Sequence, residues 1–418
     1  MDEFNHMEWK ASKLSDLIES TMTGEWGTEQ CYDENDIEVL RSTNFTNSGK
    51  IDYSNIAIRN INEKKRNLKS LIRGDTILEK SGGSPSQPVG RVIYFDKSTP
   101  FLYSNFTQRI IPSEASDPKF LFYLLFYLYT SRVVLKFQQQ TTGIINFQLS
   151  EYLEYVVQEP PLPEQKKIAK ILTAVDTVIE KTQAQIDKLN DLKTGMMQEL
   201  LTKGIGPDGK PHTEFKESAV GLIPVGWDVV RLGEVTKSIV PGRNKPALST
   251  GEIPWITISD LDSLYIDSSK EKLGVNLISL KAAGGKTVPK GTVIMTVVGD
   301  FGISSIAATE VVINQQLHGF VCNSRLDPEF LCYFLRNSRS TLDTLATKTT
   351  ISYMNKDNAE SVEMPLPSLK EQKNISKVLV SLERKLQQMV ELRSNQIDLK
   401  TALMQDLLTG KVRVTSDE

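Results

Sequence analysis

The feature that most constrains this chain is an internal repeat of its helical segments. Residues 164–202 align without gaps on residues 371–409 at a constant offset of 207, and 15 of the 39 aligned positions are identical. The identities gather at the two ends of the segment, EQK at its start and DLKT and LLT near its finish. Because the middle keeps a helical pattern with a different sequence, we expect two long helices with shared ends and variable shafts.

The repeat extends beyond the helices. A W-x4-L-x-D pattern at 9–16 is matched by W-x4-L-x-E at 227–234, and DPKFL at 117–121 is matched by DPEFL at 327–331. Each Asp-Pro pair opens an aromatic-rich run that reads as a helix. A period near 210 residues indicates a duplicated domain rather than a solenoid. The predicted order is therefore domain, helix, domain, helix.

Within each domain the signals are mixed, which predicts an α+β fold with a curved sheet. Short apolar runs typical of strands alternate with Gly, Pro and Ser loops; they are IEVLRS (37–42), RVIYF (91–95), PWITI (254–258) and TVIMTVV (292–298). The predicted divisions are a first domain at 1–160, a central helix at 161–204, a linker at 205–226, a second domain at 227–364 and a C-terminal helix at 365–414.

Apolar residues recur along both helices at alternating spacings of four and three, which is a coiled-coil seam. Two such helices can bury their apolar seams against each other. A pseudo-twofold relation between the two halves of the chain would make the two helices antiparallel. In the second helix we expect the register to slip, because Arg393 and Gln396 fall on the seam while Leu392 and Leu399 lie nearby. The expected seam residues are Ile168, Leu172, Val175, Ile179, Ile186, Leu189, Ile375, Leu379, Leu382, Leu386 and Met389.

The helix length suggests a spacer. At ~1.5 Å per residue, a 39-residue helix reaches about 58 Å, whereas a DNA groove repeats every ~34 Å. A helix pair of this length could hold two DNA-recognition domains on one face of a duplex. The alternative is a coiled coil that only dimerises the protein.

The charge distribution is uneven along the chain. The net charge is −3, but residues 1–40 hold 2 Lys/Arg against 11 Asp/Glu, and residues 41–150 hold 15 against 7. Such a change of sign can place a basic face on the first domain. Residues 221–345 balance at 12 and 12, so charge alone does not mark the second domain as a DNA site.

Several other classes of protein are disfavoured. The three cysteines form no CxxC pair, and without a recognisable signal peptide they fit a reducing cytoplasm. The apolar run at 120–129 is about half of what a bilayer span needs. The histidines lack metal-ligand spacing, and there is no GxxxxGK[ST] loop for ATP. The closest approach to an adenine-methyltransferase tetrapeptide, EPPL at 159–162, has the wrong first residue and no aromatic ring.

Taken together, these motifs resemble the specificity subunit of type I restriction–modification systems. The resemblance rests on the W-x4-L-x-[DE] pattern, a strand after a Gly-Asp or Gly-Thr pair, the Asp-Pro helix, PLP followed by EQ-x-x-I-x-x-L, and L-x-x-x-L-L-T-G at the end. The segment 214–235 is also similar to the family's connection between halves. Each motif is weak alone, but the ordered set occurs twice and covers essentially the whole chain.

The resemblance implies a non-catalytic, cytoplasmic subunit with two target recognition domains, each reading one half of a divided DNA site. It implies two methyltransferase subunits that dock on it and methylate adenine with their own S-adenosylmethionine. Motor-nuclease subunits that use ATP and Mg can join them, and this chain itself needs no cofactor. The chain departs from the family pattern in its first half, where PPLPEQ replaces the longer PLPSLKEQ and the acidic stretch 23–36 replaces a GTP-type loop.

Residues that can contact DNA were sought among polar and basic side chains in loops, since base edges and phosphates need such groups. The candidates in the first domain are Arg41, Asn44, Lys64, Lys65, Arg66, Lys80, Ser84, Gln87 and Arg91. The candidates in the second domain are Arg243, Asn244, Lys245, Thr257, Ser259 and Lys286.

Other functions remain open at this point. The same module could belong to a methylation-only or type IIB-like assembly, because a nuclease would lie on another chain. A self-contained nuclease would have to use Asp208, Glu214 and Lys216 with the preceding Pro207, in a polar linker with no strand to hold them. A coiled-coil adaptor that never meets nucleic acid is a third class.

Overall fold

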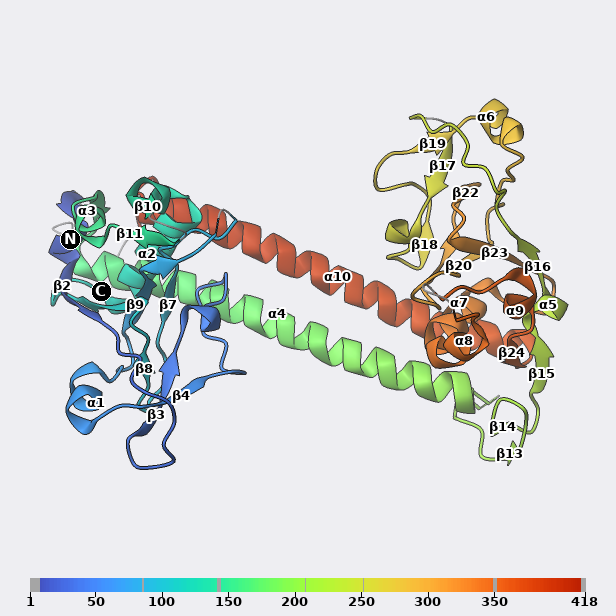
Figure 1. The fold of residues 1–418 in the computed structure, drawn as a ribbon, viewed down its shortest axis with the longest axis horizontal. Coiled ribbons are helices and arrows are strands. Elements are labelled where there is room, and N and C mark those ends of the chain that lie inside the picture. Colours follow the sequence, from blue (N-terminus) through green and yellow to red (C-terminus); the bar gives the residue numbers. More distant parts are fainter. Residues whose placement is uncertain are drawn as a thin grey trace, which may run out of the picture. The chain divides into compact units, whose positions relative to one another are not determined.

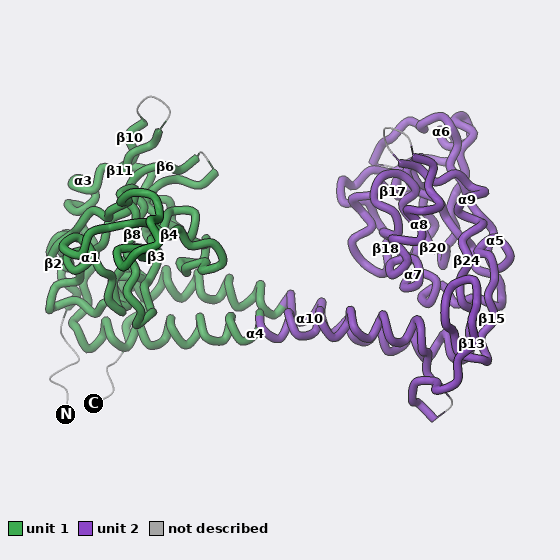
Figure 2. Tube along the Cα trace, turned by 60° about the horizontal axis from the view of Figure 1, so that its bottom comes forward, with its two compact units in different colours: residues 1–183, 392–418 green, residues 184–391 purple. Residues whose placement is uncertain are grey.

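The chain divides into two compact units, residues 1–183 with 392–418 and residues 184–391 (Figure 2). Both long helices contribute to both units. Each unit therefore comprises one globular domain, the first part of one long helix and the last part of the other. The computed structural model describes residues 8–84, 86–140, 144–206, 208–250, 252–348 and 352–414.

The domain of unit 1 is built around an antiparallel sheet in the order β2-β9-β5-β7 (Figure 1). A second sheet, β4-β3-β8, pairs β3 in parallel with β8. Strand β1 pairs with β12, and β10-β11-β6 forms a third, polar sheet. The bounds are β1 Lys10–Lys13, β2 Ile18–Thr23, β3 Asp36–Leu40, β4 Ala57–Asn60, β5 Thr76–Glu79, β6 Ser81–Gly82, β7 Val92–Tyr94, β8 Leu102–Tyr103, β9 Thr107–Pro112, β10 Gln138–Gln140, β11 Ile145–Phe147, β12 Val156–Glu159, α1 Glu63–Lys69, α2 Pro118–Thr130 and α3 Leu149–Leu153.

The domain of unit 2 repeats the four-strand order of the main sheet and adds a fifth strand, β18, parallel to β21. Its main sheet runs β16-β23-β20-β21-β18, its second sheet β19-β17-β22 again contains one parallel pair, and β15 pairs with β24. The predicted duplication is therefore confirmed. The bounds are β13 Phe215–Lys216, β14 Ile223–Pro224, β15 Asp228–Arg231, β16 Thr236–Ile239, β17 Ile253–Ile256, β18 Tyr265–Ile266, β19 Gly274–Val275, β20 Val293–Thr296, β21 Ser304–Ala307, β22 Val312–Ile313, β23 Leu317–Cys322, β24 Glu363–Leu366, α5 Leu232–Val235, α6 Leu277–Ala282, α7 Pro328–Asn337, α8 Arg339–Leu345 and α9 Lys356–Glu360.

The helices predicted after each Asp-Pro pair are confirmed as α2 and α7. The Asp117 carboxylate accepts hydrogen bonds from the backbone N–H groups of Lys119 (3.0 Å) and Phe120 (2.9 Å), and Asp327 accepts one from Phe330 (3.0 Å). Proline in the first turn costs nothing, because that N–H has no partner within a helix. Most of α2 is buried in the core of its domain, and no described helix is long and apolar enough to cross a membrane.

The long helices are α4, Leu162–Lys203, and α10, Leu369–Leu408. In unit 1, Asp176 of α4 pairs with Lys400 of α10 at 2.7 Å, and Glu164 near the start of α4 binds Arg413 beyond the end of α10. In unit 2, Lys193 pairs with Glu383 at 3.1 Å. Partner numbers fall on one helix as they rise on the other, so the helices run antiparallel within unit 1. The same holds within unit 2, where Glu371 at the start of α10 binds the segment after α4.

The seam residues lie inward to different degrees. Ile168, Leu172, Ile186, Ile375, Leu379 and Met389 are buried, and Val175, Ile179, Leu189, Leu382 and Leu386 are half-buried.

The expected slip of register in α10 is wrong. Leu392 and Leu399 are 45% and 55% exposed, whereas Arg393 and Gln396 are half-buried and the next seam position, Lys400, is buried. A helix that turned to bury the two leucines would withdraw Lys400 from Asp176. The ion pair and the apolar contacts after it therefore hold the register through two polar positions. Arg393 Nε and Gln396 Oε1 are consequently buried without a hydrogen-bond partner among the described residues.

Each domain is attached to a helix start by a tryptophan. Trp9 Nε1–H donates to Glu164 at 2.9 Å, and Trp227 Nε1–H donates to Glu371 at 3.1 Å. These bonds explain why both halves pair a W-x4-L motif with an EQ motif. The glutamines beside these glutamates, Gln165 and Gln372, accept from the backbone N–H groups of Asp117 and Asp327, each at 2.8 Å.

The end of the opposite helix completes each tryptophan contact. Gly410 and Gly204 end α10 and α4 with φ of +74° and +66°, a left-handed conformation that glycine adopts readily at a helix end. A Cβ at Gly410 would lie 2.9 Å from the Trp9 ring, and one at Gly204 would lie 2.4 Å from the Trp227 ring. Burial acts to raise the pKa of Glu164, but hydrogen bonds from Arg413 and Trp9 outweigh it and hold that pKa below its usual value.

A tyrosine makes the second attachment in each unit. Tyr123 O–H donates to Asp176 at 2.7 Å, and Tyr333 O–H donates to Glu383 at 2.9 Å. These are the two acids that also bind a lysine of the opposite helix. Burial acts to raise the pKa of Glu383, but the charges of Arg336 and Lys193 and the bond from Tyr333 hold it below its usual value. Each domain is thus fixed to one long helix by the same pair of part-buried hydrogen bonds, to α4 in unit 1 and to α10 in unit 2.

Candidate nucleic-acid interface

In unit 1, the loop after β3 holds two predicted DNA-contacting residues in internal hydrogen bonds. The buried Asn44 amide donates to the carbonyls of Asp52 (3.1 Å) and Asn55 (2.9 Å), and its oxygen accepts from the backbone N–H of Arg41 (2.9 Å). The Arg41 guanidinium donates to the Asn55 carbonyl at 3.0 Å. The assignment of Asn44 to DNA contact is corrected, because its side chain is 3% exposed and shapes the loop instead.

Arg91 requires the same correction. It is 8% exposed, and its guanidinium donates to both carboxylate oxygens of Glu79 at 2.8 and 3.0 Å. The remaining N–H groups bind the carbonyls of Phe45 and Ser42, each at 2.9 Å. Breaking a buried ion pair of this kind costs about 3–5 kcal/mol. Arg91 therefore ties the loop to the sheet and does not offer its charge to phosphate.

The basic residues 64–66 lie on α1, and two of them are engaged in ion pairs or hydrogen bonds within unit 1. Lys65 pairs with Glu25 at 3.2 Å, and Arg66 donates to the Glu34 carbonyl at 2.7 Å and to Asn35 Oδ1 at 3.1 Å. Lys64 is exposed and makes no hydrogen bond or ion pair with another described residue. Of these three residues, only Lys64 has a charged group without a hydrogen-bond or ion-pair partner among the described residues.

Lys80, Ser84 and Gln87 lie close together near β5 and β6. Ser84 and Gln87 line a cavity of about 520 Å³ that also contains the Glu79–Arg91 pair. Gln87 donates to Asn47 Oδ1 at 2.8 Å, and the half-buried Lys80 ammonium donates to Thr23 Oγ1 at 3.1 Å. Burial lowers the pKa of Lys80, with Lys69 contributing in the same direction.

These contacts change the meaning of the charge asymmetry in the sequence. Glu25 from the acidic segment pairs with Lys65 and Lys69 from the basic one, and Arg109 pairs with Asp75 at 2.8 Å. Several cations of residues 41–150 are thus paired inside unit 1. Their charges are less available to a ligand than the sequence counts suggest.

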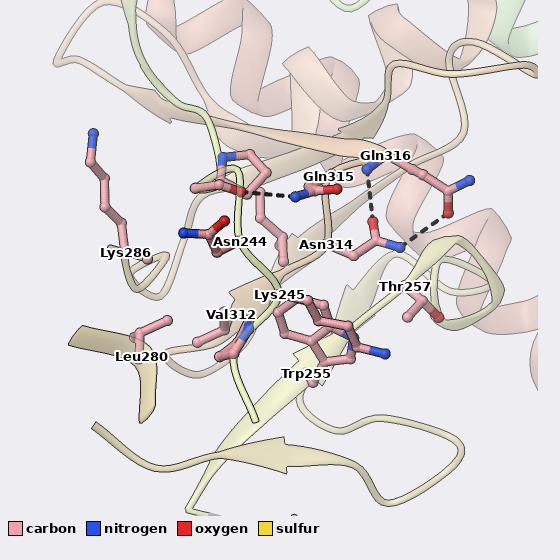
Figure 3. A pocket seen from close by; sticks show the side chains of 15 residues that line it. Asn244, Lys245, Trp255, Thr257, Leu280, Lys286, Val312, Asn314, Gln315 and Gln316 are labelled. Carbon is pink, nitrogen blue, oxygen red and sulfur yellow. Dashed lines mark hydrogen bonds between the residues drawn. The ribbon is translucent and has the colours of Figure 1, made fainter. Parts of the chain in front are cut away.

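Unit 2 shows the opposite arrangement despite its balanced sequence. Arg243, Asn244, Lys245 and Lys286 are exposed, and their side chains make no hydrogen bond or ion pair with any other described residue. Three of them, Asn244, Lys245 and Lys286, line one cavity of about 300 Å³ (Figure 3). Uncommitted cations and an amide around one cavity are suited to phosphates and base edges.

Thr257 lies at the same cavity, but its hydroxyl is engaged. It donates to Asp260 at 2.9 Å and lies 2.9 Å from the Ser259 hydroxyl. Asp260 also accepts from the Thr257 backbone N–H at 2.7 Å. This turn after β17 corresponds to the turn after β3, where Asn44 takes the place of Asp260. Exposed Ser259 remains accessible at its edge.

Sequence reasoning missed the segment Asn314–Gln316, which follows β22 and forms one wall of the cavity (Figure 3). Gln315 Nε2–H donates to the Gly242 carbonyl at 3.2 Å and to the Arg243 carbonyl, and Asn314 donates to Gln316 at 3.1 Å. Trp255 from β17 contributes to the apolar floor. The available signal was a run of three amide residues directly after a buried strand.

The residues of the nuclease alternative do not converge. Asp208 accepts the backbone N–H of Lys210 at 3.1 Å, while Glu214 and Lys216 are exposed; Pro207 lies outside the described residues. Across the described parts of the chain, no group of three His, Cys, Asp or Glu residues is placed to hold a metal ion.

Comparison with known proteins identifies the family. The family model of the type I restriction modification DNA specificity domain matches residues 6–191 and 224–398. The chain belongs to this family. It is a DNA specificity subunit of a type I restriction–modification system and carries two specificity domains.

The relatives cover most of the chain. It is 27% identical to the putative type I restriction enzyme MjaX specificity subunit of Methanocaldococcus jannaschii, over 97% of this chain and 94% of the relative. It is 31% identical to the MjaVIII specificity subunit of the same organism, over 70% of each.

Two solved structures share the fold. One comes from work on complex assembly and conformational transition of the type I R-M system, with a TM-score of 0.58, 18% identity, and coverage of 97% of this chain and 99% of that one. The other is the S subunit from M. genitalium, with a TM-score of 0.55, 15% identity and 99% coverage of both chains.

Proposed function

We propose that each specificity domain reads one half of a divided DNA sequence and that α4 and α10 set the number of base pairs between the halves. The observation that carries this proposal is the duplicated attachment of the domains. The same tryptophan and tyrosine contacts fix each domain to one long helix, to α4 in unit 1 and to α10 in unit 2. A domain held on one helix by two part-buried contacts has little freedom to turn on that helix. Helix length can then act as a spacer.

The chain supplies recognition and no catalytic step in this proposal. Two methyltransferase subunits, which bind S-adenosylmethionine, dock on the chain and methylate adenine at N6. Motor-nuclease subunits that use ATP and Mg join where cleavage occurs, and the whole assembly acts in the cytoplasm. Outward-facing apolar residues on the long helices support a docked partner. They include Leu192, Val390, Leu392 and Leu399, which are 45–55% exposed.

The affinity of the chain alone should be low. Phosphate neutralisation supplies most of the free energy of non-specific DNA binding, the net charge is −3, and many cations of unit 1 are paired internally. We expect the assembled complex to bind DNA much more tightly than the isolated chain. Tight, sequence-specific binding by the isolated chain would contradict this expectation.

The experiment is methylome sequencing of cells that express this chain with its methyltransferase partner. The expected motif has two short blocks of defined bases with an undefined gap between them. A motif of one uninterrupted block would overturn the proposal.

A charge variant tests the placement of the interface in unit 2. Replacing Arg243 and Lys245 by Ala removes two cations, so the slope of log affinity against log salt should fall by about 1.8. The matched control replaces Lys373 and Lys377, two exposed cations on α10, by Ala. Equal slopes for the variant and the control would show that the rim does not contact phosphate.

A further inference from the structure

We propose that the 300 Å³ cavity of unit 2 binds a single nucleobase that has left the DNA base stack. This inference rests on the proposed DNA-reading function of the domain and specifies the ligand of one site on it. It concerns a different mode of contact from reading base edges in a groove.

The cavity is concave and has an apolar floor, which suits a planar ring. Its floor is apolar, formed by Trp255, Leu280 and Val312, which are 6%, 3% and 3% exposed. Side chains that read paired bases protrude into a groove, because the base edges lie at its bottom. A concave apolar floor has no role in that geometry. It does accommodate a planar ring, and unstacked bases characteristically lie against aromatic side chains.

The polar side chains of the cavity are placed to bind the edge of a base. Gln315 is fixed by its bonds to the backbone of Gly242 and Arg243, and Asn314 and Gln316 bind each other. This wall is therefore held in place before any ligand enters. The Asn244 amide at the opening has no described partner and can donate to and accept from the edge of a base.

Cations at the rim match the rest of an extruded nucleotide. Lys245 and Lys286 both line the cavity (Figure 3), and neither ammonium group makes a hydrogen bond or ion pair with a described residue. A base that leaves the stack remains joined to phosphates on both sides, and these phosphates need cations next to the cavity rather than inside it. The cavity thus offers apolar side chains for the ring, an amide for the base edge and cations for the flanking phosphates. This combination favours a nucleotide within a DNA strand over a free base.

The proposal is made for unit 2 alone. The cavity of unit 1 near Ser84 and Gln87 is lined by the turn after β3 and holds the buried Glu79–Arg91 pair, whereas the cavity of unit 2 is lined by Trp255 of β17 and the segment after β22, so the two cavities are not counterparts. Only the half of the DNA motif read by unit 2 should show the effects of the proposed base site.

The test measures binding of the chain, assembled with its methyltransferase partner, to duplexes with one mismatched pair. The mismatch is moved through every position of both half-sites, and affinity is read by fluorescence anisotropy. A mismatch removes part of the cost of extruding a base. At one position in the half-site of unit 2, the mismatched duplex should bind on the order of tenfold more tightly than the matched one.

Two variants at one residue connect this effect to the cavity. Asn244→Trp places an indole over the opening and should abolish the gain, whereas Asn244→Ala leaves the opening clear but removes the amide, so it should reduce the gain without abolishing it. The inference is overturned if no position in that half-site shows a gain, or if the gain persists in Asn244→Trp. It is also overturned if the four nucleoside monophosphates bind the cavity while mismatches have no effect, because the site would then serve a free small molecule.

Failure of the underlying function would look different. If the domain does not read DNA at all, the matched duplex will bind no better than a scrambled one. A preference for the matched site without any gain from mismatches would leave the proposed function standing and remove only the base site.

Discussion

The two long helices must keep equal numbers of residues between their contacts for both sets of contacts to form. Asp176 pairs with Lys400 in unit 1, and Lys193 pairs with Glu383 in unit 2. The two contacts are therefore separated by 17 residues on each helix, since 193 − 176 and 400 − 383 both equal 17. Lengthening one helix alone should break one set, whereas lengthening both equally should preserve both.

The perturbation is a seven-residue insertion after Gln183 in α4 and after the corresponding Val390 in α10. Seven residues make two turns of a coiled coil and keep the apolar stripe on the same face. They lengthen each helix by about 10.5 Å, which corresponds to about three base pairs at ~3.4 Å each. An insertion in α4 alone should instead forfeit at least one buried ion pair, at a cost of about 3–5 kcal/mol.

Methylome sequencing provides the functional measurement, and urea unfolding provides the stability measurement. The double insertion should keep both blocks of defined bases and widen the gap between them by about three base pairs. The single insertion should unfold at lower urea concentration than the double one. If the double insertion is stable, methylates both half-sites and leaves the gap unchanged, the spacer reasoning is refuted.

Three further predictions concern stability. Glu383→Gln leaves two cations without their carboxylate and should cost about 3 kcal/mol of unfolding free energy in unit 2; unchanged urea unfolding would contradict this. The pKa of Glu164 is lowered in the folded state, so its contribution is present above the unfolded value of about 4.3 and is lost as pH falls through the lower folded pKa. Circular dichroism from pH 7 to 3 should therefore show acid unfolding that is weaker in its pH dependence for Glu164→Gln. Gly410→Ala should cost about 1–2 kcal/mol because of its positive φ; Gly195→Ala, where a Cβ meets no other atom within 4 Å, should stabilise by about 0.5–1 kcal/mol, and differential scanning fluorimetry would detect opposite shifts.

Much of the architecture could be predicted because local sequence patterns specify its elements, and these patterns occur twice in the chain. The Asp-Pro pairs mark the starts of α2 and α7, and the glycines mark the ends of α4 and α10. The predicted strand runs became β3, β7, β17 and β20. Capping, turn and periodicity signals act over a few residues, so the sequence displays them directly.

The predictions that failed depended on partners distant in the sequence. Residue type suggested that Arg91 and Asn44 would face DNA, but carboxylates and carbonyls brought in by folding satisfy both side chains. The helical period alone suggested a slip toward Leu392, but the pair between Lys400 and Asp176 holds the register. No local signal reports such contacts.

The sequence by itself determined that the molecule is doubled, with a mixed domain followed by a long amphipathic helix in each half. Only the tertiary structure decided which charges are available to a ligand and where a cavity forms. The physical reason is that an ion is neutralised, or a hollow is enclosed, by groups from separate segments. Glu25 reaches Lys65, and the loop after β22 meets the loop before β17 at Gly242, only once the chain has folded.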